Sequence, residues 1–213
     1  MKIMSGRPRV AISIPSPEYI HVRFYESLLH MHCESIGKID HMIRHAVGSR
    51  ITVNRNNLVE KAREAKATHL LFLDADMVFP PDTMQRLLAY KKDIVCATYS
   101  KRDGDPRPIG KLVSGETAVA RGPLVEFSLV GFGCMLIKMG VFDKLAKPYF
   151  AEPQAEGYDQ PDGEDIYFCR RVREAGFRIW VDVPLSEKMG HIGSKVYYME
   201  STPPDKAGLA VSQ

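Results

Sequence analysis

Short apolar runs alternate with segments of helical periodicity through the first half of the chain, and this alternation restricts the fold more than any other feature of the sequence. The apolar runs predict strands over residues 10–14, 50–53, 69–73 and 94–98. The periodic segments predict helices over residues 19–31 and 54–65 and after Asp82, with Asn54 and Asp82 as N-caps. This alternation is typical of an α/β domain in which helices flank a central, mainly parallel sheet.

After Tyr99 the sequence is less regular, with segments rich in glycine, proline and charge. The sequence predicts polar loops over 101–110 and 152–163, strands over 125–137 and 177–181, and helices over 141–145 and 164–175. Gly176 stands where a helix-ending glycine belongs. Because no repeat or linker separates two halves, we expect a single domain over residues 1–200 and a flexible C-terminal tail over residues 201–213.

The composition limits the classes of partner that we expect the protein to bind and the cellular compartment in which we expect it. The net charge of +3 is mixed along the chain, which suits an anionic substrate such as a nucleotide. No basic patch with interleaved aromatics is present, so nucleic acid is a less favoured partner. The four cysteines lie far apart in apolar surroundings, which predicts buried free thiols in a reducing compartment. No segment has the length and apolarity of a signal peptide or a membrane span, so we expect a cytoplasmic protein.

Two aspartates follow the most apolar predicted strand, in the sequence HLLFLDADMVFPPD. If the extended conformation persists, Asp74 and Asp76 project to the same side, at the sheet edge where α/β proteins bind ligands. Two carboxylates this close repel one another unless a cation lies near them. Oxygen ligands suit Mg²⁺ or Mn²⁺, which also bind substrate phosphates. The alternative is a surface turn that uses aspartate only for its backbone hydrogen bonds. The buried strand before the pair favours the metal interpretation.

The order of apolar first strand, second strand, Asp-x-Asp and helix resembles the GT-A fold, a Rossmann-like fold of nucleotide-sugar glycosyltransferases. The resemblance is to the family 2-like branch and its small phage and bacterial members, and it extends over residues 10–193. It implies a nucleotide pocket at the end of the first strand, at the Arg-Asn pair in TVNRNNLVEKA and at the acidic motif. The residues it assigns to that pocket are Pro15, Ser16, Arg55, Asn56, Asp74 and Ala75.

The glycine-containing segment VGFGCMLI is similar to the strand that lines the acceptor side in this family. The resemblance implies that Gly131, Phe132 and Gly133 contact the acceptor, with the Phe132 ring stacked on a sugar. The residues themselves leave a second interpretation equally open, namely a β-bulge with a phenylalanine in the core.

Two further motifs complete the resemblance. Glu164 and Asp165 correspond to the acidic pair at the start of a helix, where Asp165 aligns with the general base of inverting members. The same two residues also suit a helix N-terminus for electrostatic reasons alone. His191, between two glycines, resembles the C-terminal histidine that joins the acidic pair in metal coordination.

Together these motifs predict a metal-dependent glycosyltransferase that moves a sugar from a nucleoside diphosphate sugar to a hydroxyl acceptor. The resemblance at Asp165 implies inversion of the anomeric configuration, and a retaining outcome stays open. Asp74, Asp76 and His191 would hold Mn²⁺ or Mg²⁺, and Asp165, with Glu164 beside it, would act on the acceptor. Two alternatives stay open at this point. One is a nucleotidyltransferase, although no glycine-rich phosphate loop follows the first strand. The other is a non-catalytic sugar- or nucleotide-binding module.

Overall fold

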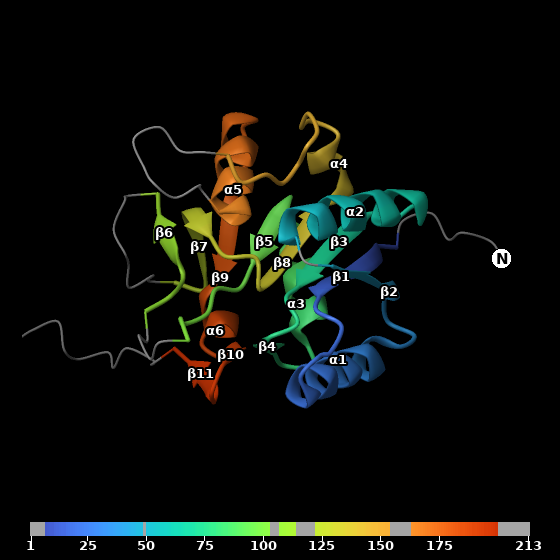
Figure 1. Cartoon of the computed structure of the whole chain (residues 1–213), viewed down its shortest axis with the longest axis vertical. Coiled ribbons are helices and arrows are strands. Elements are labelled where there is room, and N and C mark those ends of the chain that lie inside the picture. The colour runs from blue at the N-terminus through green and yellow to red at the C-terminus, as the bar shows by residue number, and fades with distance from the viewer. Residues whose placement is uncertain (1–6, 49, 103–106, 114–121, 154–162, 200–213) are drawn as a thin grey trace, which may run out of the picture.

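A mixed β-sheet between two layers of helices forms the body of the protein (Figure 1). The structure is a computed structural model, and it describes residues 7–48, 50–102, 107–113, 122–153 and 163–199. Most of the predicted loop over residues 152–163 and the whole predicted tail over 201–213 lie outside the described residues.

Within the described residues, eight strands form the main sheet in the order β2-β1-β3-β8-β5-β9-β7-β6. Their bounds are β1 Arg9–Ser16, β2 Asp40–Val47, β3 His69–Leu73, β5 Ile94–Cys96, β6 Gly110–Leu112, β7 Leu124–Val130, β8 Cys134–Lys138 and β9 Ile179–Asp182. Strand β1 pairs in parallel with β2 and β3, and β5 with β9, whereas every pairing of β8 and β7 is antiparallel. Strands β8 and β7 therefore run against the rest of this sheet. The predicted α/β class with a mainly parallel sheet is confirmed.

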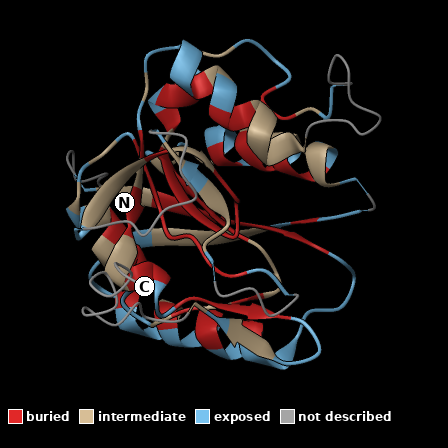
Figure 2. Ribbon diagram, turned by 90° about the vertical axis from the view of Figure 1, so that its left-hand side faces the viewer, coloured by how far each residue is buried: buried red, intermediate tan, exposed pale blue. Residues whose placement is uncertain are grey.

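Helices cover both faces of the sheet because its strands are apolar on both sides (Figure 2). Along β3, Leu70 and Phe72 face one core, and Leu71 and Leu73 face the other. The first core is closed by helices α2 Ile51–Glu64, α4 Met139–Phe142 and α5 Glu164–Glu174. The second is closed by α1 Val22–Ser35, α3 Thr83–Ala89 and α6 Val183–Ser186.

Local sequence signals explain helix α5, and its bounds lie close to the predicted helix over residues 164–175. Acidic residues occupy its first turn and basic residues its last, which complements the helix dipole. Gly176 has a φ of 87° just past the helix end, a left-handed conformation that glycine adopts without steric cost.

The predicted strand over residues 50–53 is wrong, because helix α2 begins at Ile51 and Arg50 is its N-cap. Asn54 therefore lies within α2 and is not a cap. The β-branched residues at the start of α2 favour strand locally, but burial of Leu58, Val59 and Ala62 against the sheet outweighs that propensity. The second strand is instead β2, an edge strand whose residues are mostly half-buried or exposed and so form no apolar run.

The predicted continuous strand over residues 125–137 is also wrong. It breaks at Gly131–Gly133 into β7 and β8, which β5 and β9 separate in the sheet. A second, smaller sheet was not predicted. It contains β4 Met77–Val78, β10 Gly190–Ile192 and β11 Val196–Tyr198 in the order β11-β10-β4.

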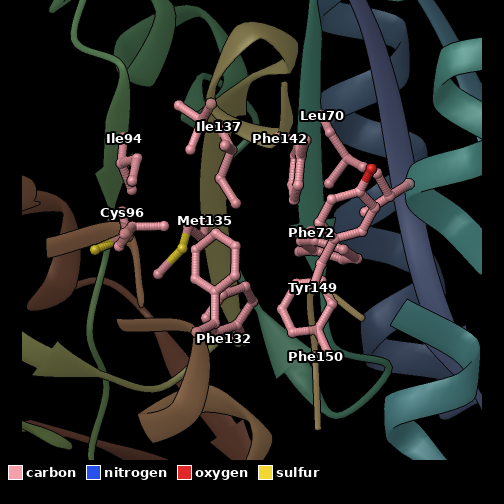
Figure 3. Close-up of a cluster of buried hydrophobic side chains, with 14 of the residues drawn as sticks. Leu70, Phe72, Ile94, Cys96, Phe132, Met135, Ile137, Phe142, Tyr149 and Phe150 are labelled. Carbon is pink, nitrogen blue, oxygen red and sulfur yellow. The ribbon is translucent and has the colours of Figure 1, made fainter. Parts of the chain in front are cut away.

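A cluster of phenylalanines fills the core on the face of the sheet that helix α5 covers (Figure 3). Phe132 is 1% exposed, and its ring centroid lies 5.6 Å from that of Phe72, 5.3 Å from that of Phe150 and 5.1 Å from that of Phe168. These edge-to-face contacts use the ring as core packing. Of the two interpretations of Phe132, the structure supports the core phenylalanine, and the ring has no open face for an acceptor sugar.

All four cysteines are free, and three of them are buried as expected, whereas Cys33 is exposed on α1. None of the described helices combines the length and the apolar character needed to cross a membrane.

An ion pair between Arg86 of α3 and the buried carboxylate of Asp182 joins α3 to the junction between β9 and α6. This pair gives a stability prediction. Arg86 lies 2.5 Å and 2.9 Å from the two carboxylate oxygens of Asp182, which is fully buried. Replacing Arg86 with Met leaves the buried carboxylate of Asp182 without its counter-charge. We therefore expect urea denaturation to show a loss of about 3 kcal/mol in the free energy of unfolding. Arg63→Met is the matched control, because the Arg63–Asp143 pair is exposed and should contribute less than about 1 kcal/mol. Equal losses in the two variants would contradict the assignment.

Candidate functional site

A cleft of about 470 Å³ opens at the carboxyl ends of the adjacent parallel strands β1 and β3. This is the edge at which α/β sheets bind ligands. Tyr19 and His21, between β1 and α1, also line it, and no sequence motif had singled them out. The full lining is Pro15, Pro17, Tyr19, His21, Ile51, Arg55, Asp74, Ala75, Asp76, Arg102 and Glu164.

The acidic pair lies on a turn and not on an extended segment as predicted. The N–H of Met77 donates to the carbonyl of Asp74 at 3.1 Å, which closes the turn, and the N–H of Asp74 donates to the carbonyl of Gly133 at 3.2 Å. The turn sends the carboxylates of Asp74 and Asp76 to different partners, yet both line the cleft. Both carboxylates therefore lie at one cleft, although the backbone that carries them forms a turn and not the expected extended segment.

Arg55 is the buried cation between the two acidic motifs. Its Nη2 donates to both carboxylate oxygens of Asp74, at 3.0 Å and 3.2 Å, and its Nε donates to Oε1 of Glu164 at 3.2 Å. The side chain is only 2% exposed. The guanidinium lies 5.3 Å from the ring centroid of Phe72 and 5.0 Å from that of Phe132. One arginine thus joins the end of β3 to the start of α5.

The protonation of this group follows from its surroundings. Burial lowers the pKa of Arg55, but the charges of Asp74 and Glu164 outweigh burial and leave it raised, so the guanidinium stays charged. Burial raises the pKa of Asp74, and the nearby Asp76 adds to the rise, against the opposing charge of Arg55. Within the described part of the chain, Nη1 of Arg55 is buried and has no hydrogen-bond partner. That spare donor lies on a residue that lines the cleft.

Asp76 has its own set of partners. Its Oδ2 lies 3.0 Å from Nη2 of Arg102 and 3.5 Å from Nε2 of His191. Burial alone raises the pKa of Asp76, but the hydrogen bond and charge of His191, together with Arg102, hold it below the ordinary value. The Nδ1 of His191 lies 2.9 Å from the carbonyl oxygen of Ser100, which can only accept. Nδ1 therefore carries a proton, and the hydrogen bond to Asp76 requires a second proton on Nε2, whereas a bound cation would take the lone pair of Nε2 in place of that proton.

The small sheet explains how His191 reaches the acidic turn from far along the chain. Strand β10 pairs antiparallel with β4, which places His191 opposite Met77, directly after Asp76. In addition, the N–H of Ile192 donates to the carbonyl of Asp76 at 2.7 Å. The predicted association of His191 with Asp76 is observed, and the backbone fixes it.

The predicted acceptor glycines accommodate a tyrosine. A Cβ atom on Gly131 would lie 2.6 Å from Oη of Tyr99, and one on Gly133 would lie 2.4 Å from Cε1 of the same ring. Tyr99 is 6% exposed, accepts a hydrogen bond from the N–H of Gly133 at 3.1 Å, and packs edge-on against His191 with centroids 4.9 Å apart. These glycines thus allow the close approach of Tyr99, which in turn supports the histidine.

The other predicted site residues have varied positions. Pro15 and Ala75 line the cleft, and Ser16 is buried at the end of β1. Asn56 lines a second pocket on the outer side of α2. Its amide donates to the carbonyls of Thr52 and Phe150 and accepts from the N–H groups of Tyr149 and Phe150. In the structure, Asn56 therefore joins α2 to the backbone of Tyr149 and Phe150, in place of the expected nucleotide contact.

Of the acidic pair at the start of α5, Glu164 is among the residues that line the cleft and Asp165 is not. Glu164 also pairs with Arg55. Asp165 accepts a hydrogen bond from the N–H of Ile166 at 2.7 Å. Burial raises the pKa of Asp165, and the charge of Glu164 adds to the rise. A carboxylate with a raised pKa is a better proton acceptor than a free one.

The donor atoms of the site fit a divalent cation at Asp76 and His191. A carboxylate and an imidazole whose second nitrogen is held by a carbonyl are suitable ligands for Mn²⁺. Asp74 is already engaged by Arg55, and the described residues bring together no group of three or more His, Cys, Asp or Glu side chains able to hold a metal. Two protein ligands would leave coordination positions for phosphate oxygens, as magnesium-like ions commonly require.

The buried Arg55 gives a testable prediction for stability and its pH dependence. Arg55→Met leaves Asp74 and Glu164 without their cation, so we expect a loss of about 3–5 kcal/mol in the free energy of unfolding at pH 7, measured by urea denaturation. Arg55→Lys keeps the charge but cannot make the several hydrogen bonds of the planar guanidinium. We therefore expect it to lose less stability than Arg55→Met.

The Arg55→Met deficit should shrink as the pH falls. Without Arg55 the pKa of Asp74, already raised by burial, rises further above its unfolded value of about 3.9. The folded state then binds the proton more readily than the unfolded state, so the variant regains stability relative to wild type as the pH falls toward that value. A deficit that is the same at pH 7 and pH 5 contradicts this account.

Comparison with known proteins identifies the fold and the family of the chain. Among solved structures, the crystal structure of A197 from STIV is similar, with a TM-score of 0.64 and 21% sequence identity over 91% of this chain and 95% of that chain. At this identity the likeness shows the fold alone. A search of curated proteins finds no match. Residues 28–146, more than half of the chain, match the family model for Glycosyl transferase family 2. The expected GT-A-like fold is confirmed, and the chain belongs to glycosyl transferase family 2.

Proposed function

We propose that this protein transfers a sugar from a nucleoside diphosphate sugar to a hydroxyl acceptor in a metal-dependent reaction. The observation that carries the proposal is the convergence of Asp74, Asp76, Arg55 and Glu164 on one cleft at the carboxyl edge of the sheet, with His191 fixed behind it. Membership of the family supports a nucleotide-sugar donor.

Several residues in and beside the cleft have a role in donor binding under this proposal. Asp76 and His191 would hold Mn²⁺ or Mg²⁺, which would supply positive charge to neutralise the departing diphosphate. Pro15 and Ala75 form the wall of the nucleotide pocket at the end of β1 and in the acidic turn, and Ser16 is buried beside Pro15. Asp74, held in one orientation by Arg55, presents its carboxylate to the nucleotide.

The acceptor reacts on the α5 side of the cleft. Asp165 takes the proton of the acceptor hydroxyl as its oxygen attacks the anomeric carbon, and the sugar–diphosphate bond breaks in the same displacement. A single displacement of this kind inverts the anomeric configuration. Glu164, tied to Arg55, keeps the start of α5 in place and raises the pKa of its neighbour.

Replacing Asp76 with Asn tests the metal assignment. The amide removes the charged ligand, so we expect Mn²⁺-dependent affinity for UDP or GDP to fall by roughly ten- to a hundredfold while the fold is retained. Isothermal titration calorimetry with and without Mn²⁺ measures the affinity, and a thermal-shift panel of nucleoside diphosphates first identifies the base. Asp93→Asn is the control, because this exposed aspartate pairs with Lys138 on the surface. Unchanged Mn²⁺-dependent affinity in Asp76→Asn would disprove the assignment.

Replacing Asp165 with Asn tests the base. Turnover on a donor panel should be lost, whereas calorimetric affinity for the nucleoside diphosphate should match wild type. In the wild-type protein, kcat should fall as the pH drops through the raised pKa of Asp165, because only the ionised carboxylate accepts the proton. Asp143→Asn, at an exposed ion pair, is the control. Retained turnover in Asp165→Asn rules out this residue as the base.

A further inference from the structure

The two aspartates of the acidic turn are each paired with an arginine, but the two pairs differ in kind. Arg55 is 2% exposed and contacts Asp74 through both carboxylate oxygens, so it is a permanent part of the site. The side chain of Arg102 is 54% exposed, and its Nη2 lies 3.0 Å from Oδ2 of Asp76, whose side chain is 34% exposed. Half-exposed ion pairs contribute little stability, so this second contact is easily exchanged.

The position of Arg102 is nevertheless defined by the structure. Its backbone follows Ser100, whose carbonyl orients His191 and whose own strand bridge to Pro108 anchors the segment. The aliphatic part of its side chain lies against Gly193, since a Cβ atom there would be 3.2 Å from Cδ and 3.3 Å from Cγ of Arg102. The guanidinium is thereby directed to the same Oδ2 atom of Asp76 that His191 approaches.

We propose that Arg102 is a built-in, displaceable counter-cation for Asp76, which competes with the divalent ion and transfers to the donor's diphosphate when the ion binds. This inference rests on the proposed function. The guanidinium keeps the acidic turn neutralised in the free protein, which avoids repulsion between Asp74 and Asp76. Once released, its planar fork suits a phosphate oxygen pair, and it already lines the cleft.

The proposal predicts effects of opposite sign on two ligands. Without nucleotide, Arg102→Ala removes a competing positive charge beside Asp76, so affinity for Mn²⁺ alone should rise roughly three- to tenfold. With saturating Mn²⁺, the same variant should bind UDP or GDP roughly three- to tenfold more weakly, because a diphosphate contact is lost. A merely structural arginine would weaken both or change neither.

The experiment measures Mn²⁺ binding to the nucleotide-free protein by electron paramagnetic resonance of the free ion, and nucleotide binding by calorimetry. Arg102→Lys retains a competing charge and should stay close to wild type for Mn²⁺ while losing part of the nucleotide affinity. Arg178→Ala is the control, because this exposed arginine also approaches a carboxylate, that of Glu126, but away from the cleft. Thermal melts of all variants verify that they are folded.

The outcomes separate this inference from the proposed function. Tighter Mn²⁺ binding with weaker nucleotide binding in Arg102→Ala supports it. If wild type binds Mn²⁺ and nucleotide and Arg102→Ala behaves as Arg178→Ala does, the inference is overturned and the metal-dependent site stands. If neither wild type nor any variant binds Mn²⁺ or a nucleoside diphosphate, both fail together.

Discussion

The site depends on one buried positive charge. Arg55 lies among phenylalanine rings and is nearly without solvent contact, an environment that tolerates an ion only when it is paired. Its two partners, Asp74 and Glu164, come from the ends of β3 and the start of α5, which are distant in sequence. Because the buried charge needs both partners, it holds the end of β3 and the start of α5 at a fixed separation across the cleft.

A second constraint is carried by backbone and not by charge. The pairing of β4 with β10 brings the turn that holds Asp76 beside the strand that holds His191. The hydrogen bond from His191 to the carbonyl of Ser100 then selects its tautomer, and the ring of Tyr99 supports it from the side. Two side chains from distant parts of the chain, Asp76 and His191, are thus aligned mainly by hydrogen bonds of the backbone.

Much of this architecture could be predicted from local sequence signals. The apolar run of β3, the acidic pair at its end and the helix α5 with its acidic start and closing Gly176 are all encoded within a few residues, although the turn that carries the acidic pair is not. Predictions failed where the structure depends on distant partners. Strand β2 is an edge strand and needs no apolar run, the β-branched start of α2 is helical because of packing, and β4 and β10 are too short to recognise without each other.

The contact between Tyr99 and the backbone at Gly133 has an evolutionary consequence. Since the ring fills the volume that a side chain at position 133 would take, neither position can change alone without steric overlap or a void. In related sequences the two positions should covary, large aromatic with glycine or smaller residue with side chain. Relatives that have made the double exchange would lack the ring that packs against His191 and would have to support this histidine in another way.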